Sequence, residues 1–172
     1  TTMCTYVDDC KLEADRRRRE TVWKCIRLMF ESDDPMEIMA FLGVKCEGPL
    51  IRGPSYKMYF HQSEYIDNML EDYRQMHKRD PRPCTTVGQA GSPPDTTNTE
   101  KRSGGTTVRS TLGSSSYAVR GTRPDGCFST NRLGRYVDKW DPDWCPKELH
   151  HLMGYFRETI GYQLVMANYG DA

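Results

Sequence analysis

The amino-acid sequence predicts an α+β fold in which short β-hairpins and helices alternate before a polar segment and a final helical region. Three observations predict it. Residues 1–12 are rich in β-branched and aromatic side chains, as in a hairpin. Several later segments repeat apolar residues at helical spacing. Residues 85–108 are rich in Gly, Ser, Thr and Pro. A chain of 172 residues forms one ordinary domain or two small ones.

The first predicted element is a β-hairpin with two acidic residues at its tip. Residues 1–7 have strand character, Asp8 and Asp9 are typical turn residues, and residues 10–12 can form the returning strand. The hairpin would display the two carboxylates together.

A helix is predicted over residues 14–31, because apolar residues recur there at helical spacing. Its predicted apolar face consists of Val22, Cys25, Ile26, Met29 and Phe30. The run of four arginines at residues 16–19 has two interpretations. Guanidinium groups match phosphate geometry, but charge runs are also common on solvated helix starts, and Asp15 and Glu20 flank this one.

A second hairpin and a second helix are predicted next. Residues 40–46 and 56–60 have strand character, and the segment between them carries two glycines and two prolines, which suits an irregular connection. Gln62 or Ser63 can cap a helix that runs to about His77. The predicted apolar face of that helix consists of Tyr65, Ile66, Met69, Leu70 and Tyr73.

Residues 85–108 are predicted to form a disordered linker, because they have too few apolar side chains to offset the entropy of ordering. Beyond the linker, spacing predicts three short helices over residues 109–119, 125–137 and 146–159. Residues 162–167 could form one more strand.

Composition limits the possible partners and compartment. Lys plus Arg and Asp plus Glu both number 24, so overall charge gives no argument for a nucleic-acid partner. The seven cysteines form no CxxC pair, which favours reduced thiols in an intracellular protein. No apolar run approaches the roughly 20 residues of a membrane-spanning helix, so no membrane partner is predicted. The start at Thr1, within a predicted strand, indicates an excerpt from a longer polypeptide.

The acidic pair at the hairpin tip is the first candidate for chemistry. Mg²⁺ prefers carboxylate oxygens, and nucleotide polymerisation uses two such ions to activate the primer hydroxyl and stabilise the leaving pyrophosphate. The alternative is that Asp8 and Asp9 are only favourable turn residues.

Five blocks of sequence, in order, resemble the reverse transcriptase of copia-type retrotransposons. Tyr-Val-Asp-Asp at residues 6–9 and Phe-Leu-Gly-Val-Lys at residues 41–45 resemble its metal turn and its Phe-Leu-Gly-Ile-Glu strand. Residues 60–66 are similar to the entry into its thumb. Residues 110–117 and 121–125, followed by residues 131–136, resemble its Gly-Ser-Leu-x-Tyr and Gly-Thr-Arg-Pro-Asp block. Residues 144–162 also resemble the helix that precedes its ribonuclease H.

The resemblance implies RNA-directed DNA synthesis by two-metal nucleotidyl transfer, with Mg²⁺ as the cofactor. Asp8 would be a metal ligand, and Asp9 a weaker or second-sphere ligand. Tyr6 and Val7 would lie beside the incoming nucleotide or primer end, and Phe41, Leu42 and Gly43 would belong to the primer grip. The partners implied are an RNA/DNA primer-template and the remainder of the Pol polyprotein, including fingers and ribonuclease H.

The same resemblance divides the chain into four parts. Residues 1–60 would be a palm remnant of two hairpins packed on a helix, and residues 61–84 a thumb helix. Residues 85–108 would be the linker, and residues 109–172 a helical connection region before ribonuclease H.

Departures from the family pattern limit what the isolated chain can do. The family's other metal-binding Asp and its fingers lie N-terminal to the hairpin and are not in this sequence, so the chain alone is expected to be inactive. Ser32, Asp33 and Asp34 stand where the family often has a Lys. Two alternatives therefore stay open: a non-catalytic interaction remnant of a decayed element, and an unrelated regulatory domain.

Overall fold

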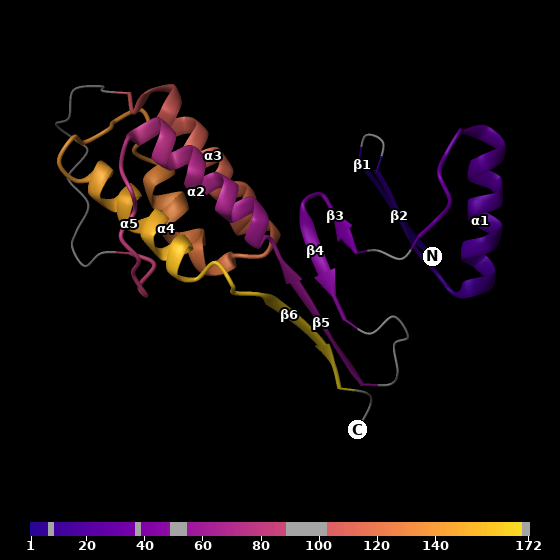
Figure 1. Ribbon diagram of the computed structural model, residues 1–172. Helices are drawn as coiled ribbons and strands as arrows, with labels where there is room; N and C mark the ends of the chain where they lie inside the picture. The colour runs from indigo at the N-terminus through magenta and orange to yellow at the C-terminus, as the bar shows by residue number, and fades with distance from the viewer. Residues whose placement is uncertain (7–8, 37–38, 49–54, 89–102, 170–172) are drawn as a thin grey trace. The chain divides into compact units, whose positions relative to one another are not determined.

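A computed structural model describes residues 1–6, 9–36, 39–48, 55–88 and 103–169, with mixed α and β structure (Figure 1). The chain divides into two compact units. The first, called here the N-terminal unit, comprises Thr1–Met58 and Ala167–Ala172. The second, called the helical unit, comprises Tyr59–Met166.

The predicted N-terminal hairpin is confirmed. Strand β1 (Thr2–Tyr6) pairs antiparallel with β2 (Asp9–Glu13), in a register that runs from Thr2 opposite Glu13 to Tyr6 opposite Asp9. Helix α1 (Arg16–Met29) follows after two residues. Its N-terminus is capped by Asp15, whose side chain accepts a hydrogen bond of 3.0 Å from the backbone N–H of Arg18.

The apolar face predicted for α1 is largely exposed among the described residues. Val22 and Ile26 are only half-buried, whereas Cys25, Met29 and the C-cap residue Phe30 are exposed. No residue of α1 is buried. In the described part of this unit, the buried apolar side chains are those of Cys46 and Met58. The described residues therefore cover the apolar face of this helix only in part.

The strand predicted over residues 40–46 is interrupted by a tight turn. Strands β3 (Ala40–Phe41) and β4 (Val44–Glu47) pair antiparallel, with Phe41 opposite Val44. Leu42 and Gly43 form the two-residue loop with φ of 51° and 71°, the signs that a type I′ hairpin turn requires. Glycine adopts this conformation freely, whereas a leucine pays about 1 kcal/mol or more.

A second sheet has the strand order β3-β4-β5-β6. Strand β5 (Tyr56–His61) leads directly into helix α2, and β6 (Leu164–Asn168) is the final strand predicted from the sequence (Figure 1). The connection predicted between β4 and β5 falls largely on residues 49–54, which lie outside the described residues.

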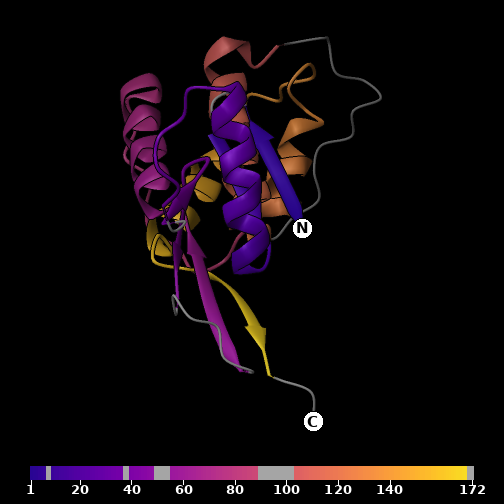
Figure 2. The ribbon, with the colours of Figure 1, turned by 90° about the vertical axis from the view of Figure 1, so that its right-hand side faces the viewer.

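The helical unit contains the remaining helices. These are α2 (Ser63–His77), α3 (Gly105–Gly121), the 3-10 turn η2 (Pro124–Gly126), α4 (Cys127–Gly134) and α5 (Cys145–Glu158). The four α-helices lie side by side in Figures 1 and 2. The second helix and the three later helices predicted from spacing are thus confirmed, with boundaries shifted by a few residues.

One continuous apolar core joins these four helices. Helix α2 contributes four predicted face residues, Ile66, Met69, Leu70 and Tyr73, all at most 4% exposed. Helix α5 contributes Leu149, Leu152, Met153 and Phe156, and α3 and α4 supply Leu112 and Leu133. The helix that the sequence assigned to a thumb therefore shares its core with the region assigned to a connection.

The predicted linker is too long at both ends. Val87 packs partly buried against the core, and α3 begins at Gly105, so that Val108 is buried at 7% exposed. These two valines supply the apolar contacts that order their segments. Residues 89–102, the middle of the predicted linker, lie outside the described residues. No helix in the described part of the chain is long and apolar enough to span a membrane.

Candidate functional site

The sequence predicted a metal turn at residues 6–9, between β1 and β2. Tyr6 pairs with Asp9, so the two strands are connected by the two residues Val7 and Asp8. Those two residues lie outside the described part of the chain, as do the side chains of Tyr6 and Asp9. Among the described residues, no group of three or more His, Cys, Asp or Glu side chains could hold a metal ion.

The predicted primer-grip residues lie at the β3–β4 turn. Phe41 ends β3, and Leu42 and Gly43 form the turn itself rather than a continuous strand. Phe41 and Leu42 are half-buried, and Gly43 is exposed. The tight turn therefore places these three residues at one end of a short hairpin.

The four arginines at the start of α1 are all exposed. Two of them form ion pairs with acids close in sequence: Arg16 with Glu20 at 3.4 Å, and Arg18 with Asp15 at 3.2 Å. Such exposed pairs contribute little to stability. Arg17 and Arg19 have no ion-pair partner among the described residues. The exposure of all four arginines fits the solvated-face interpretation, and no described contact tests whether the run binds phosphate.

A pocket of about 840 Å³ opens beside α1, within the N-terminal unit. Its apolar lining comes from Leu12 of β2, Trp23 of α1, Met36, Met39 and Met58. Five cationic side chains also line it: Lys11, Arg16, Arg19, Lys24 and Arg27. Its acidic lining residues are Glu13, Glu20 and Asp34. The pocket therefore combines an apolar floor with an excess of positive charge.

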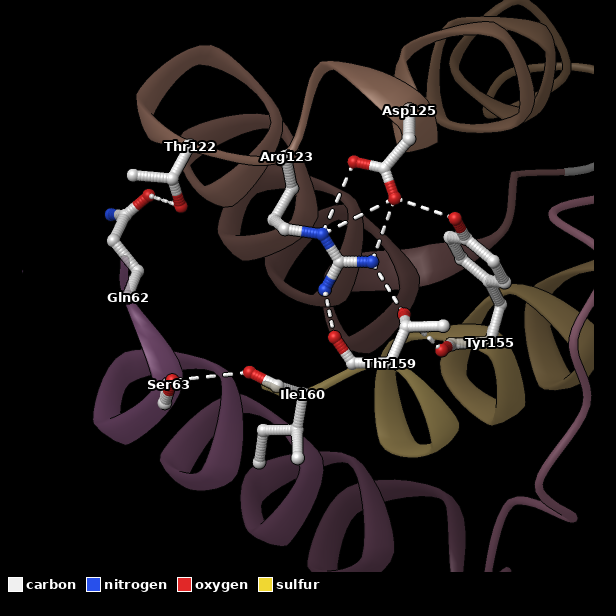
Figure 3. A network of polar contacts seen from close by, with 8 residues as sticks. All are labelled: Gln62, Ser63, Thr122, Arg123, Asp125, Tyr155, Thr159 and Ile160. Atoms are coloured by element: carbon white, nitrogen blue, oxygen red, sulfur yellow. Dashed lines mark hydrogen bonds and ion pairs between the residues drawn. The ribbon is translucent and has the colours of Figure 1, made fainter. Parts of the chain in front are cut away.

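The helical unit holds a buried polar network around Arg123, in the Gly-Thr-Arg-Pro-Asp block (Figure 3). The Arg123 side chain is 1% exposed and donates to both oxygens of Asp125, at 2.7 Å from Nη2 to Oδ2. It also donates to the carbonyl oxygen of Thr159 at 3.0 Å. The guanidinium lies over the rings of Tyr155 and Phe156, 5.4 and 5.2 Å from their centroids. Every face of this buried cation is therefore occupied.

Hydrogen bonding sets the ionisation of this network. Burial would raise the pKa of the Asp125 carboxyl, but hydrogen bonds from Arg123 and from the Tyr155 hydroxyl, the latter 2.6 Å, outweigh burial and lower it. Burial, and then its bond to Asp125, raise the pKa of Tyr155. The network is thus fixed as an arginine–carboxylate pair with a neutral tyrosine, which is a structural arrangement.

Two further hydrogen bonds join the start of α2 to the same region (Figure 3). The hydroxyl of Thr122 donates to the side-chain oxygen of Gln62 at 3.1 Å, and the hydroxyl of Ser63 donates to the carbonyl of Ile160 at 3.1 Å. Gln62 and Thr122 are each 2% exposed. The Arg123 region therefore connects the beginning of α2 to the ends of α3 and α5.

A second buried ion pair lies between α4 and α5. Arg132 Nη2 is 3.1 Å from Glu148 Oε1, and the Glu148 side chain is 1% exposed. Although Arg132 Nη2 and Glu148 Oε1 are this close, neither atom has a hydrogen-bond partner. The pair is therefore an ion pair without hydrogen-bond geometry. The Arg132 guanidinium also lies over the Trp144 ring, 4.8 Å from its centroid. We interpret the contact as an electrostatic attachment of α4 to α5.

Two half-buried histidines flank the buried Tyr73 of α2. The Tyr73 hydroxyl is 3.1 Å from His150 Nδ1 of α5, and the His77 ring stacks on Tyr73 with centroids 4.5 Å apart. His77 Nε2 is 3.0 Å from the hydroxyl of Thr111 in α3. Burial lowers the pKa of both histidines, and Arg79 and Arg82 lower that of His150 further. Neutral imidazoles thus link α2, α3 and α5.

Searches of protein-family models, curated proteins and solved structures find nothing that matches this chain.

Sequence reasoning proposed the hairpin acids as the site and missed the polar residues that organise the helical unit. It treated Arg123 and Asp125 only as part of a family-like block, and it assigned no role to His77 or Tyr155. One local signal was present: an arginine two residues before an aspartate, with proline between them, can close a bidentate pair across a tight turn. Its burial depends on α5, which lies far along the chain.

Proposed function

We propose that the chain is the palm and thumb portion of an RNA-directed DNA polymerase of the copia-type retrotransposon class. The observation that best supports this is the β1–β2 register, in which Tyr6 pairs with Asp9 and only Val7 and Asp8 connect the strands. A two-residue connection is the shortest common hairpin loop, and it would bring adjacent carboxylates to the hairpin end. Asp8 and Asp9 would there bind Mg²⁺ beside the primer terminus.

The order of the elements also supports the proposal. Helix α1 follows the hairpin, the β3–β4 turn carries Phe41, Leu42 and Gly43, and β5 leads into α2. In the proposed polymerase the β3–β4 turn contacts the primer end, and α2 is the first thumb helix. Catalysis requires a further metal-binding carboxylate and the fingers from the rest of the polyprotein, so the isolated chain does not extend a primer.

The proposal is tested by restoring the missing part. The chain is expressed in one polypeptide with an N-terminal polymerase half of the same class, and primer extension is measured on poly-rA with Mg²⁺. Asp8→Asn is expected to lower extension by about 100-fold or more, because it removes a carboxylate that would bind Mg²⁺. Each lost factor of ten corresponds to about 1.36 kcal/mol of transition-state stabilisation. Asp33→Asn, at an exposed acid after α1, is the matched control and retains activity. Equal activity of the Asp8 and Asp33 variants would remove Asp8 from the mechanism.

A second candidate function is a non-catalytic interaction module left by a decayed element. The exposed apolar face of α1, including Met29 and Phe30, favours it. The same fusion separates the two candidates, since an interaction module gives no primer extension in either the unaltered protein or the Asp33→Asn control.

A further inference from the structure

The described part of the N-terminal unit exposes more large apolar side chains than it buries. Its described part buries the apolar side chains of Cys46 and Met58. Six large apolar side chains are between 47% and 86% exposed, namely Met3, Leu28, Met29, Phe30, Met36 and Met39. Burial of apolar surface is the main force that offsets conformational entropy in a unit of this size. The described residues of the unit therefore leave these apolar side chains largely uncovered.

The pocket beside α1 is lined by two of these exposed side chains, Met36 and Met39. Leu12, Trp23, Met36, Met39 and Met58 come from different elements of the unit and line the same space. The volume of about 840 Å³ is large enough to receive several side chains. Methionine is flexible and polarisable, which suits a surface that packs against an incoming apolar segment.

The charged side chains of the pocket lining indicate which charge should flank an incoming apolar segment. Arg16 and Arg27 already pair with Glu20 and Asp34. The other three cations of the lining, Lys11, Arg19 and Lys24, have no ion-pair partner in the described part of the chain. Unpaired cations around an apolar floor favour a ligand with apolar groups at its centre and negative charge at its edges.

A polypeptide satisfies both requirements better than a nucleic acid does. A nucleic-acid strand would neutralise the cations, but its phosphates would leave the methionines and the neighbouring Leu28, Met29 and Phe30 uncovered. An amphipathic helix can lay its apolar side on such a surface and place acidic side chains against the rim.

We propose that the pocket formed by Leu12, Trp23, Met36, Met39 and Met58 is a docking site for a polypeptide segment with an apolar face and acidic flanks, and that this segment covers the apolar side chains of the lining. The inference depends on the proposed function only for the origin of the segment, which in a polymerase would be the remainder of the polyprotein.

The first experiment uses the full chain and three synthetic helical peptides, each carrying a fluorescent label for anisotropy. One peptide has Leu and Phe on one face and Glu on the other. The second has Lys in place of Glu, and the third keeps Glu but has Ser in place of Leu and Phe. The first peptide is expected to bind, and the other two at least about tenfold more weakly. Hydrogen exchange should slow in α1 and β2 when the first peptide is added.

Substitutions in the chain test the location of the site. The double variant Arg19→Glu with Lys24→Glu should weaken binding of the Glu peptide and strengthen binding of the Lys peptide. Arg17→Glu, on the same helix but outside the pocket lining, should change the binding of neither peptide. Met39→Ser should weaken binding, and Met3→Ser, an exposed methionine outside the lining, should not.

Several results would overturn the inference. These are no binding of the Glu peptide, equal effects of the Arg17 and Arg19/Lys24 variants, or displacement of the peptide by a short oligonucleotide, which would make the pocket a nucleic-acid site. Peptide binding together with an inactive polymerase fusion would refute the proposed function while leaving the docking site in place.

Discussion

Two helices of equal length show how differently the two units of this protein are built. Helices α1 and α5 each contain 14 residues, and each has apolar residues at helical spacing. Helix α5 buries eight residues, whereas α1 buries none. Phe156 near the end of α5 is fully buried, and Phe30 at the end of α1 is 65% exposed. Amphipathic spacing therefore predicted both helices, but only the surrounding chain determines whether the apolar face is covered.

The sharpest test of this difference is the same substitution in each unit. Phe156→Ala should lower the free energy of unfolding of the helical unit by about 4 kcal/mol, because it removes a fully buried ring and leaves a cavity. Phe30→Ala should change stability by less than about 0.5 kcal/mol, since that ring is mostly in solvent. Urea unfolding followed by circular dichroism measures both, and equal losses would mean that the α1 face is covered in solution.

The next largest effect is expected at the buried arginine. Arg123→Met should destabilise the helical unit by about 3 kcal/mol, because Asp125 would lose its bidentate partner while Tyr155 still holds it in a partly buried position. Arg120→Met, at an exposed arginine three residues earlier, is the matched control. If the two variants unfold at the same urea concentration, the network does not contribute to stability as its burial suggests.

A pair of glycines tests how closely the helical unit is packed. A Cβ at Gly154 would lie 2.0 Å from the carbonyl oxygen of Arg82, so Gly154→Ala must displace backbone and should cost about 2 kcal/mol. A Cβ at Gly113 of α3 would have no neighbour within 4 Å. Gly113→Ala should therefore stabilise the unit by about 0.5–1 kcal/mol through helix propensity. Thermal unfolding of the two variants should shift in opposite directions, and a shift in the same direction would contradict the close contact with Arg82.

The fold was predictable wherever local pattern and packing agree. The apolar face of α2 was predicted residue by residue, because Ile66, Met69, Leu70 and Tyr73 meet a partner of matching character on α3 and α5. The strand over residues 40–46 was misjudged because its β-branched and aromatic residues outweighed the turn signal of Gly43. The ends of the linker were misjudged because a polar composition hid two single valines, Val87 and Val108, that reach the core.

The candidate site was predictable only in part, for a different reason. Turn chemistry predicted Asp8 and Asp9 at a hairpin end, and the described register pairs Tyr6 with Asp9, while Asp8 lies outside the described residues. The roles of Arg123 and His150 arise from contacts with residues more than thirty positions away in the chain, such as Thr159 and Tyr73. Such contacts follow from the packing of helices and have no counterpart in local spacing.

The smallest expected effect is a dependence of the stability of the helical unit on pH. All four histidines, at residues 61, 77, 150 and 151, belong to the helical unit. Burial lowers the pKa of His77 and His150 in the folded chain below the ordinary value of 6.5. The charged and titratable groups that act on His150 are Arg79, Arg82, Asp80 and His151.

The sign of this dependence follows from proton uptake. Between pH 6.5 and the lowered pKa values, the unfolded chain binds protons that the folded chain does not, so stability is retained above pH 6.5 and declines as pH falls below it. The carboxyls of Asp80 and Asp125, whose pKa values are also lowered, add a second decline only below about pH 4. Urea unfolding of the helical unit at a series of pH values should show both steps. The double variant His77→Gln with His150→Gln should lose the decline below pH 6.5 and keep the decline below about pH 4. If the decline below pH 6.5 survived in the double variant, it would be assigned to other titrating groups.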